Sequence, residues 1–204
     1  MRFIEFKKNL ENFIVFSLND IRKIKIDFDL RRLNEWQNKG YIKMIRRGYY
    51  VFSDLNLNES TLLLIANKIY LPSYISFEMA FSYYSLIPEA VYGITSATSK
   101  KTNRFKADFG EFIYHHIKPE LMFGYKLVKY QNHNFKIAEI EKALLDYFYI
   151  NSHLKTENDF IEMRFNAGEF RKQTNTERLQ RYLVVFNNKS MEKRIKRFLK
   201  YIKK

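Results

Sequence analysis

The sequence predicts an α+β protein: N-terminal helices that end in a hairpin, a middle part with a small, mainly antiparallel sheet, and C-terminal helices. Apolar residues recur at helical spacing near both ends of the chain, and they alternate with a period of two through much of the middle. The 204 residues are 46% hydrophobic and 17% aromatic, which is enough apolar material for a packed core in one domain or two small ones.

The first 25 residues predict two short helices. Ser17 and Asp20 have the spacing of a capping box, and they begin the second helix, which continues through Ile24. The first helix is predicted from apolar residues at helical spacing, which are Phe3, Phe6, Leu10, Phe13 and Ile14.

A third helix and a hairpin follow. Asp27 is expected to cap the helix, which runs to about Asn38 and stops at Gly40. Its apolar face holds Leu30, Leu33 and Trp36. Two β-rich runs, 41–45 and 49–52, surround the short turn formed by residues 46–48. Three short helices and a hairpin with a basic tip predict a winged helix-turn-helix domain over residues 1–54.

Residues 55–204 predict a second, α+β domain. Ser76 is expected to cap one of its helices, and Glu141 and Asp146 are expected to cap or pair with neighbouring structure. The predicted helices are 59–70, 77–84 and 140–149, and the predicted strands are 94–98, 112–117, 125–130 and 135–138.

The C-terminal residues 190–204 predict a basic amphipathic helix, preceded by another helix around residues 179–186. Three interpretations of its basic face stay open: a solvated surface, a second phosphate-contacting surface, or a membrane or partner surface. Its apolar stripe consists of Met191, Ile195, Phe198, Leu199 and Ile202. The candidate residues of the second basic surface are Lys193, Arg194, Lys196, Arg197 and Lys200.

Positive charge is concentrated at the two ends of the chain. Residues 1–52 hold 12 basic and 6 acidic side chains, residues 53–150 hold 10 of each, and residues 151–204 hold 14 and 6. The formal net charge of +14 therefore comes from the ends alone. Both ends are expected to meet a polyanion, with nucleic acid as the first candidate and a membrane surface as the second.

A winged helix-turn-helix with these charges fits duplex DNA. Its third helix enters the major groove, where Arg31 and Arg32 are expected to reach phosphate or guanine. Arg46 and Arg47 at the hairpin tip are expected to reach the adjacent minor groove or its phosphates, and Lys43 to support the backbone contact. A solvated basic surface and a protein-interaction module are the alternatives for the same pattern.

No pattern in the sequence predicts an enzyme, a metal site or a cofactor. Cysteine is absent, and the adjacent His115 and His116 would point to opposite faces of a strand. Asp108 and Glu111 lack the Glu-x-Lys that a nuclease carboxylate pair needs, and there is no Gly-rich phosphate loop. Apolar runs of about five residues are too short for a membrane span, and together with the charged N-terminus they predict a soluble, cytoplasmic protein. Since duplex DNA is the leading partner, no membrane partner is expected.

Short strings in a fixed order along nearly the whole chain resemble one family. The chain resembles the AbiEi-type antitoxins of type IV toxin–antitoxin and phage-abortive-infection systems, which are bacterial transcriptional regulators. None of the matching residues is catalytic. The strings are IRRGYY at 45–50, PSYISFE at 72–78, VYGIT at 91–95 with Thr98, YHHI at 114–117, and Ala138 with EKALLD at 141–146.

The resemblance implies a repressor of its own two-gene operon that binds inverted repeats in double-stranded operator DNA through the winged helix. It also implies that the second domain counteracts a nucleotidyltransferase-type toxin without forming a stable complex with it. The residues themselves predict only the DNA-binding half. A stand-alone winged-helix transcriptional regulator without a toxin partner is the alternative, and a nuclease-like enzyme is the third.

Overall fold

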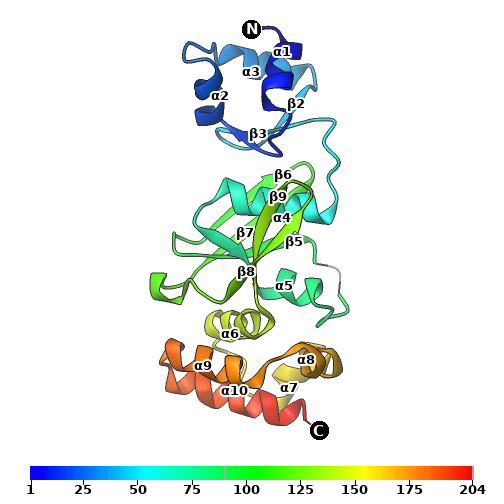
Figure 1. Ribbon diagram of the computed structural model, residues 1–204. Coiled ribbons are helices and arrows are strands. Elements are labelled where there is room, and N and C mark those ends of the chain that lie inside the picture. Colours follow the sequence, from blue (N-terminus) through cyan, green and yellow to red (C-terminus); the bar gives the residue numbers. More distant parts are fainter. Residues whose placement is uncertain (90, 204) are drawn as a thin grey trace.

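The computed structural model describes residues 1–89 and 91–203, and it stacks them in three parts along one long axis (Figure 1). The N-terminal helices lie at one end, a larger sheet lies in the centre, and the C-terminal helices lie at the other end. The two termini are therefore at opposite ends of the molecule. The fold is α+β, as predicted, with a six-stranded mixed sheet and a small three-stranded antiparallel sheet.

The N-terminal part combines short helices with a small sheet, whose strand order is β1-β3-β2. The predicted capping box is confirmed, because the Ser17 side chain accepts the Asp20 N–H while the Asp20 carboxylate accepts the Ser17 N–H. The rings of Phe6 and Trp36 pack in an aromatic core, with their centres 4.6 Å apart and their planes tilted by 47°. The elements are α1 (Phe3–Leu10), β1 (Phe16–Ser17), α2 (Leu18–Ile24), α3 (Arg31–Asn38), β2 (Ile42–Arg46) and β3 (Tyr49–Phe52).

Helix α3 begins later than predicted. Asp29, and not Asp27, stabilises its first turn, because the Asp29 carboxylate accepts the Arg31 backbone N–H at 3.0 Å and also binds the Arg31 guanidinium. A short acidic side chain bonded to the backbone two residues ahead favours a turn over a helix, so residues 25–30 stay outside the helix.

The β2–β3 hairpin is buried on both faces. Ile42, Tyr50 and Phe52 pack into the core of the N-terminal helices, whereas Ile45 and Val51 pack into the core of the central sheet. Successive side chains of a strand point to opposite faces, so this short hairpin joins the two cores.

The central part has the sheet order β6-β7-β5-β4-β9-β8. Parallel pairing joins β5 to β7 and β4 to β9, and the other neighbours are antiparallel. The sheet is thus larger and more mixed than predicted, because strands β4 and β6 were not expected. The elements are α4 (Glu59–Ile69), β4 (Ser73–Ile75), α5 (Phe77–Tyr83), β5 (Gly93–Thr98), β6 (Asn103–Ala107), β7 (Gly110–His116), η1 (Pro119–Leu121), β8 (Tyr125–Tyr130), β9 (His133–Ala138) and α6 (Ile140–Ile150).

Helix α6 lies between the sheet and a C-terminal group of helices (Figure 1). The amphipathic prediction for the last helix is confirmed, since Met191, Ile195 and Phe198 are fully buried. No helix in the described part of the chain is long and apolar enough to cross a bilayer. The C-terminal elements are α7 (Glu157–Glu162), α8 (Ala167–Gln173), α9 (Thr176–Phe186) and α10 (Lys189–Tyr201), of which α7 and α8 were not predicted.

Candidate nucleic-acid interface

Helix α3 presents a polar face to solvent. Its apolar residues Leu33 and Trp36 are 2% exposed and anchor the opposite face in the aromatic core. The Arg31 side chain is 90% exposed, and its guanidinium lies 3.0 Å from the Asp29 carboxylate, which lowers the pKa of Asp29. Asn34 and Asn38 follow Arg31 at i+3 and i+7 and are also exposed. The sequence reasoning missed both asparagines, although their spacing from Arg31 identifies the face.

Two of the predicted DNA-binding residues are half-buried at this end of the molecule. Arg32 donates from its guanidinium to the Met1 carbonyl oxygen at 2.8 Å, so it fastens the N-terminus to α3. Lys43 lies on β2 opposite Val51. Neither side chain is as open to solvent as that of Arg31.

Arg46 lies at the junction with the central sheet and not at a free hairpin tip. The strand register shifts between Met44 and Arg46, and such a bulge re-aims the side chains that follow it. The Arg46 guanidinium lies 4.7 Å from the ring centre of Tyr49, 4.8 Å from that of Phe105 and 5.7 Å from that of Tyr70. Its positive charge therefore serves a cation–π contact between two parts of the chain.

The two-residue turn of the hairpin consists of Arg47 and Gly48. Gly48 has a φ of +83°, which a residue with a side chain rarely adopts, and its carbonyl accepts the Leu18 N–H at 3.1 Å. This bond fastens the turn to the start of α2. Arg47 is exposed beside it.

The second predicted basic surface lies on α10, at the opposite end of the molecule (Figure 1). Lys193, Lys196, Arg197 and Lys200 are exposed there. Arg194 is only 6% exposed, so its inclusion in a surface was wrong. It points inward, donates to the Asn151 carbonyl oxygen at 2.9 Å and lies over the Phe148 ring.

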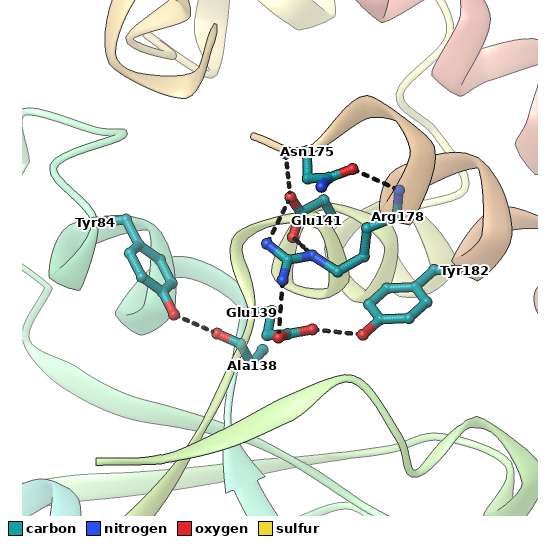
Figure 2. A network of polar contacts seen from close by, with 7 residues as sticks. All are labelled: Tyr84, Ala138, Glu139, Glu141, Asn175, Arg178 and Tyr182. Carbon is teal, nitrogen blue, oxygen red and sulfur yellow. Dashed lines mark hydrogen bonds and ion pairs between the residues drawn. The ribbon is translucent and has the colours of Figure 1, made fainter. Parts of the chain in front are cut away.

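Figure 2 shows the polar contacts that attach the C-terminal helices to α6. The Arg178 guanidinium on α9 donates to both oxygens of Glu141, at 2.9 and 3.1 Å, and to Glu139 at 3.1 Å. The Asn175 N–H also donates to Glu141 at 2.6 Å, and the Tyr182 hydroxyl donates to Glu139. Glu141 is fully buried, and its carboxylate raises the pKa of Arg178. The prediction that Glu141 pairs with neighbouring structure is confirmed.

A second ion pair is formed by two buried residues of α6 itself. Lys142 and Asp146 are both fully buried, and their ammonium and carboxylate are in contact. The hydroxyls of Tyr74 and Ser76 each donate to Asp146 at 2.8 Å, which confirms the predicted pairing of Asp146 and explains why Ser76 does not cap α5 with its side chain. Burial raises the pKa of Asp146 and lowers that of Lys142, and each charge opposes the shift of the other. Full burial gives this network a structural role.

No three His, Cys, Asp or Glu side chains among residues 1–89 and 91–203 are grouped so that they could hold a metal ion. His115 packs edge-on against the Phe77 ring, and the Nδ1–H of His116 donates to the Lys100 carbonyl oxygen at 3.0 Å. Glu111 pairs with Arg104 at 3.4 Å and with Lys106 at 3.8 Å.

Comparison with protein-family models finds no match, and comparison with curated proteins finds none either.

Proposed function

We propose that the chain is a DNA-binding regulator whose N-terminal part is a winged helix-turn-helix. The observation that carries this proposal is the order of elements α1-β1-α2-α3-β2-β3 together with the antiparallel sheet order β1-β3-β2. In this arrangement α3 is the recognition helix, α2 crosses the DNA backbone and the β2–β3 hairpin is the wing. Three exposed basic residues on or just after α2, Arg22, Lys23 and Lys25, support the backbone contact.

The exposed face of α3 has side chains suited to reading bases. Arg31 fits the acceptors of guanine, and Asn34 and Asn38 fit the donor and acceptor of adenine in the major groove. Because the Arg31–Asp29 pair is exposed, a phosphate or a base can take the place of Asp29. Arg47 is the wing residue of this proposal, since the guanidinium of Arg46 is engaged with aromatic rings.

A gel-shift titration with the DNA upstream of the gene, at two salt concentrations and against a scrambled duplex, tests the proposal. We expect specific retention that falls steeply with salt, because bound cations displace counterions. The double variant Arg31→Ala/Arg47→Ala should bind at least about tenfold more weakly, with a salt slope reduced by about 2. Asn34→Ala should relax sequence preference by about 1–3 kcal/mol at one base pair.

The matched control is Lys68→Ala/Lys129→Ala, which removes two exposed cations elsewhere on the surface. It should leave the specific affinity unchanged. Equal affinities of the two double variants would contradict the assignment of α3 and the hairpin turn to the DNA interface.

The antitoxin part of the proposal rests on the resemblance to AbiEi-type antitoxins. The regulator then represses its own operon, in phage defence, and counteracts a nucleotidyltransferase-type toxin without a stable complex. Co-expression with a nucleotidyltransferase encoded by the neighbouring gene tests this part. Rescue of growth by the full chain is the expected result. Operator binding without any rescue of growth would indicate a stand-alone transcriptional regulator that has no toxin partner.

A further inference from the structure

Helix α10 carries one continuous stripe of cations. Lys193 and Lys200 lie two turns apart on the same side of the helix. At 100° per residue, the other cations of the stripe lie on the same arc of roughly 120° around the helix axis. The buried residues Met191, Ile195 and Phe198 occupy the opposite side. The members of this α10 stripe are Lys189, Lys193, Lys196, Arg197 and Lys200, all of them exposed, and the exposed Lys203 follows just after the end of the helix.

The α10 stripe has little counter-charge. Lys196 pairs with Glu192. Over the described ranges 1–89 and 91–203, no ion pair involves Lys193, Arg197, Lys200 or Lys203. Like charges along one face repel each other, and a polyanion laid along them removes that repulsion and releases its own counterions.

The packing of α10 decides which polyanion fits. A helix that lies on a membrane inserts its apolar face into the lipid, but the apolar face of α10 is already buried in the protein. Single-stranded nucleic acid needs exposed aromatic side chains on which its bases stack, and the α10 stripe consists of lysine and arginine alone. The remaining candidate is the sugar–phosphate backbone of a duplex, which the α10 stripe binds without recognising the base sequence.

The position of α10 in the molecule determines how many DNA segments one chain can contact. The stripe lies at the far end of the long axis from α3 and the hairpin, with the central sheet between them (Figure 1). The two surfaces therefore do not share one short stretch of DNA. We propose that the α10 stripe binds the backbone of a second DNA duplex, so that one chain bridges two DNA segments. The bridging rests on the proposed function, because the first duplex is the one held by the N-terminal part. A chain held on its operator meets neighbouring DNA at high effective concentration.

A two-duplex capture experiment with the full chain tests the inference. An immobilised operator duplex is loaded with protein and washed, and a labelled duplex of unrelated sequence is then added. The wild-type chain should capture the second duplex. The variant Lys193→Gln/Arg197→Gln/Lys200→Gln should remain on the operator but capture at least about tenfold less. The control Lys68→Gln/Lys129→Gln/Lys155→Gln, with the same loss of exposed charge, should capture as the wild type does.

Failure of this inference and failure of the proposed function are distinguishable. If the N-terminal part does not bind DNA, Arg31→Ala/Arg47→Ala changes nothing, yet the α10 variant still lowers retention of the unrelated duplex and its salt slope by up to about 3. Equal retention and equal salt slope of the α10 variant and its control would overturn the inference. Capture of double-stranded RNA or of anionic vesicles in preference to DNA would overturn it as well.

Discussion

The guanidinium carbon of Arg46 lies 4.8 Å from the centre of the Phe105 ring, across the junction between strand β2 and the edge strand β6. Tyr49 from the hairpin and Tyr70 from the end of α4 surround the same cation. One arginine therefore links the small N-terminal sheet to the large central sheet. Its planar, delocalised cation suits such stacking better than the compact ammonium of lysine.

We expect Arg46→Ala and Phe105→Ala each to destabilise the protein, with a coupling energy between them of about 0.5–2 kcal/mol in a double-mutant cycle. The reason is that either change removes the same cation–π contact. Urea denaturation of the four proteins of the cycle measures the coupling. Arg47→Ala, the neighbouring exposed arginine, should leave stability nearly unchanged. If the effects of Arg46→Ala and Phe105→Ala on the free energy of unfolding were additive, the Phe105 ring would not hold the Arg46 guanidinium.

The buried ion pair between Lys142 and Asp146 leads to a second prediction about stability. Lys142→Met should lower the free energy of unfolding by about 3–5 kcal/mol, because it leaves a carboxylate buried without its counter-ion. The double variant Lys142→Met/Asp146→Leu should be less destabilised than this single variant, since it leaves no buried carboxylate without its counter-ion. Denaturant unfolding compares the two.

An exposed pair serves as the control for that comparison. Glu192→Gln removes the partner of Lys196 on the surface of α10 and should leave stability unchanged, because exposed ion pairs are screened by water and salt. A double variant less stable than Lys142→Met would refute this account. It would indicate that the hydrogen bonds to Tyr74 and Ser76 stabilise the core more than the enclosed charges cost.

Local signals in the sequence predicted local structure well. The Ser17–Asp20 capping box fixed the start of α2, and the apolar stripe of residues 191–202 predicted which face of α10 is buried. Each of these signals lies within one helix and depends on spacing alone. The α+β fold class followed from the change of period along the chain.

Features made by contacts distant in the sequence could not be predicted. Strand β4 has three residues, and its partners β5 and β9 lie about 20 and 60 residues further along, beyond any local pattern. Arg46 and Arg194 resemble surface arginines in sequence, but long side chains bury their stems and stack their heads where the tertiary structure supplies rings and carbonyl groups. Pairing of Arg178 with Glu141 likewise joins residues 37 positions apart.

Tyr182 contributes to the stability of the folded protein in a way that depends on pH in the alkaline range. Its hydroxyl donates to the Glu139 carboxylate, and burial together with this bond raises the pKa of Tyr182 from 10.0 to about 12. The folded state therefore holds this proton more tightly than the unfolded state does. The resulting stabilisation is fully present below pH 10 and is lost as the pH rises from about 10 to about 12.

We therefore expect the stability difference between the wild type and Tyr182→Phe to be constant at neutral pH and to shrink between about pH 10 and 12. Phenylalanine keeps the ring contact with Phe123 but has no proton to release. Urea denaturation at a series of pH values measures the difference, and absorbance at the tyrosinate band follows the ionisation itself. Tyr92→Phe is the matched control, because Tyr92 is 96% exposed and should keep the pH dependence of the wild type. A difference that stays constant up to pH 12 would mean that Glu139 does not hold the Tyr182 hydroxyl, and that Arg178 and Asn175 connect α9 to the start of α6 without it.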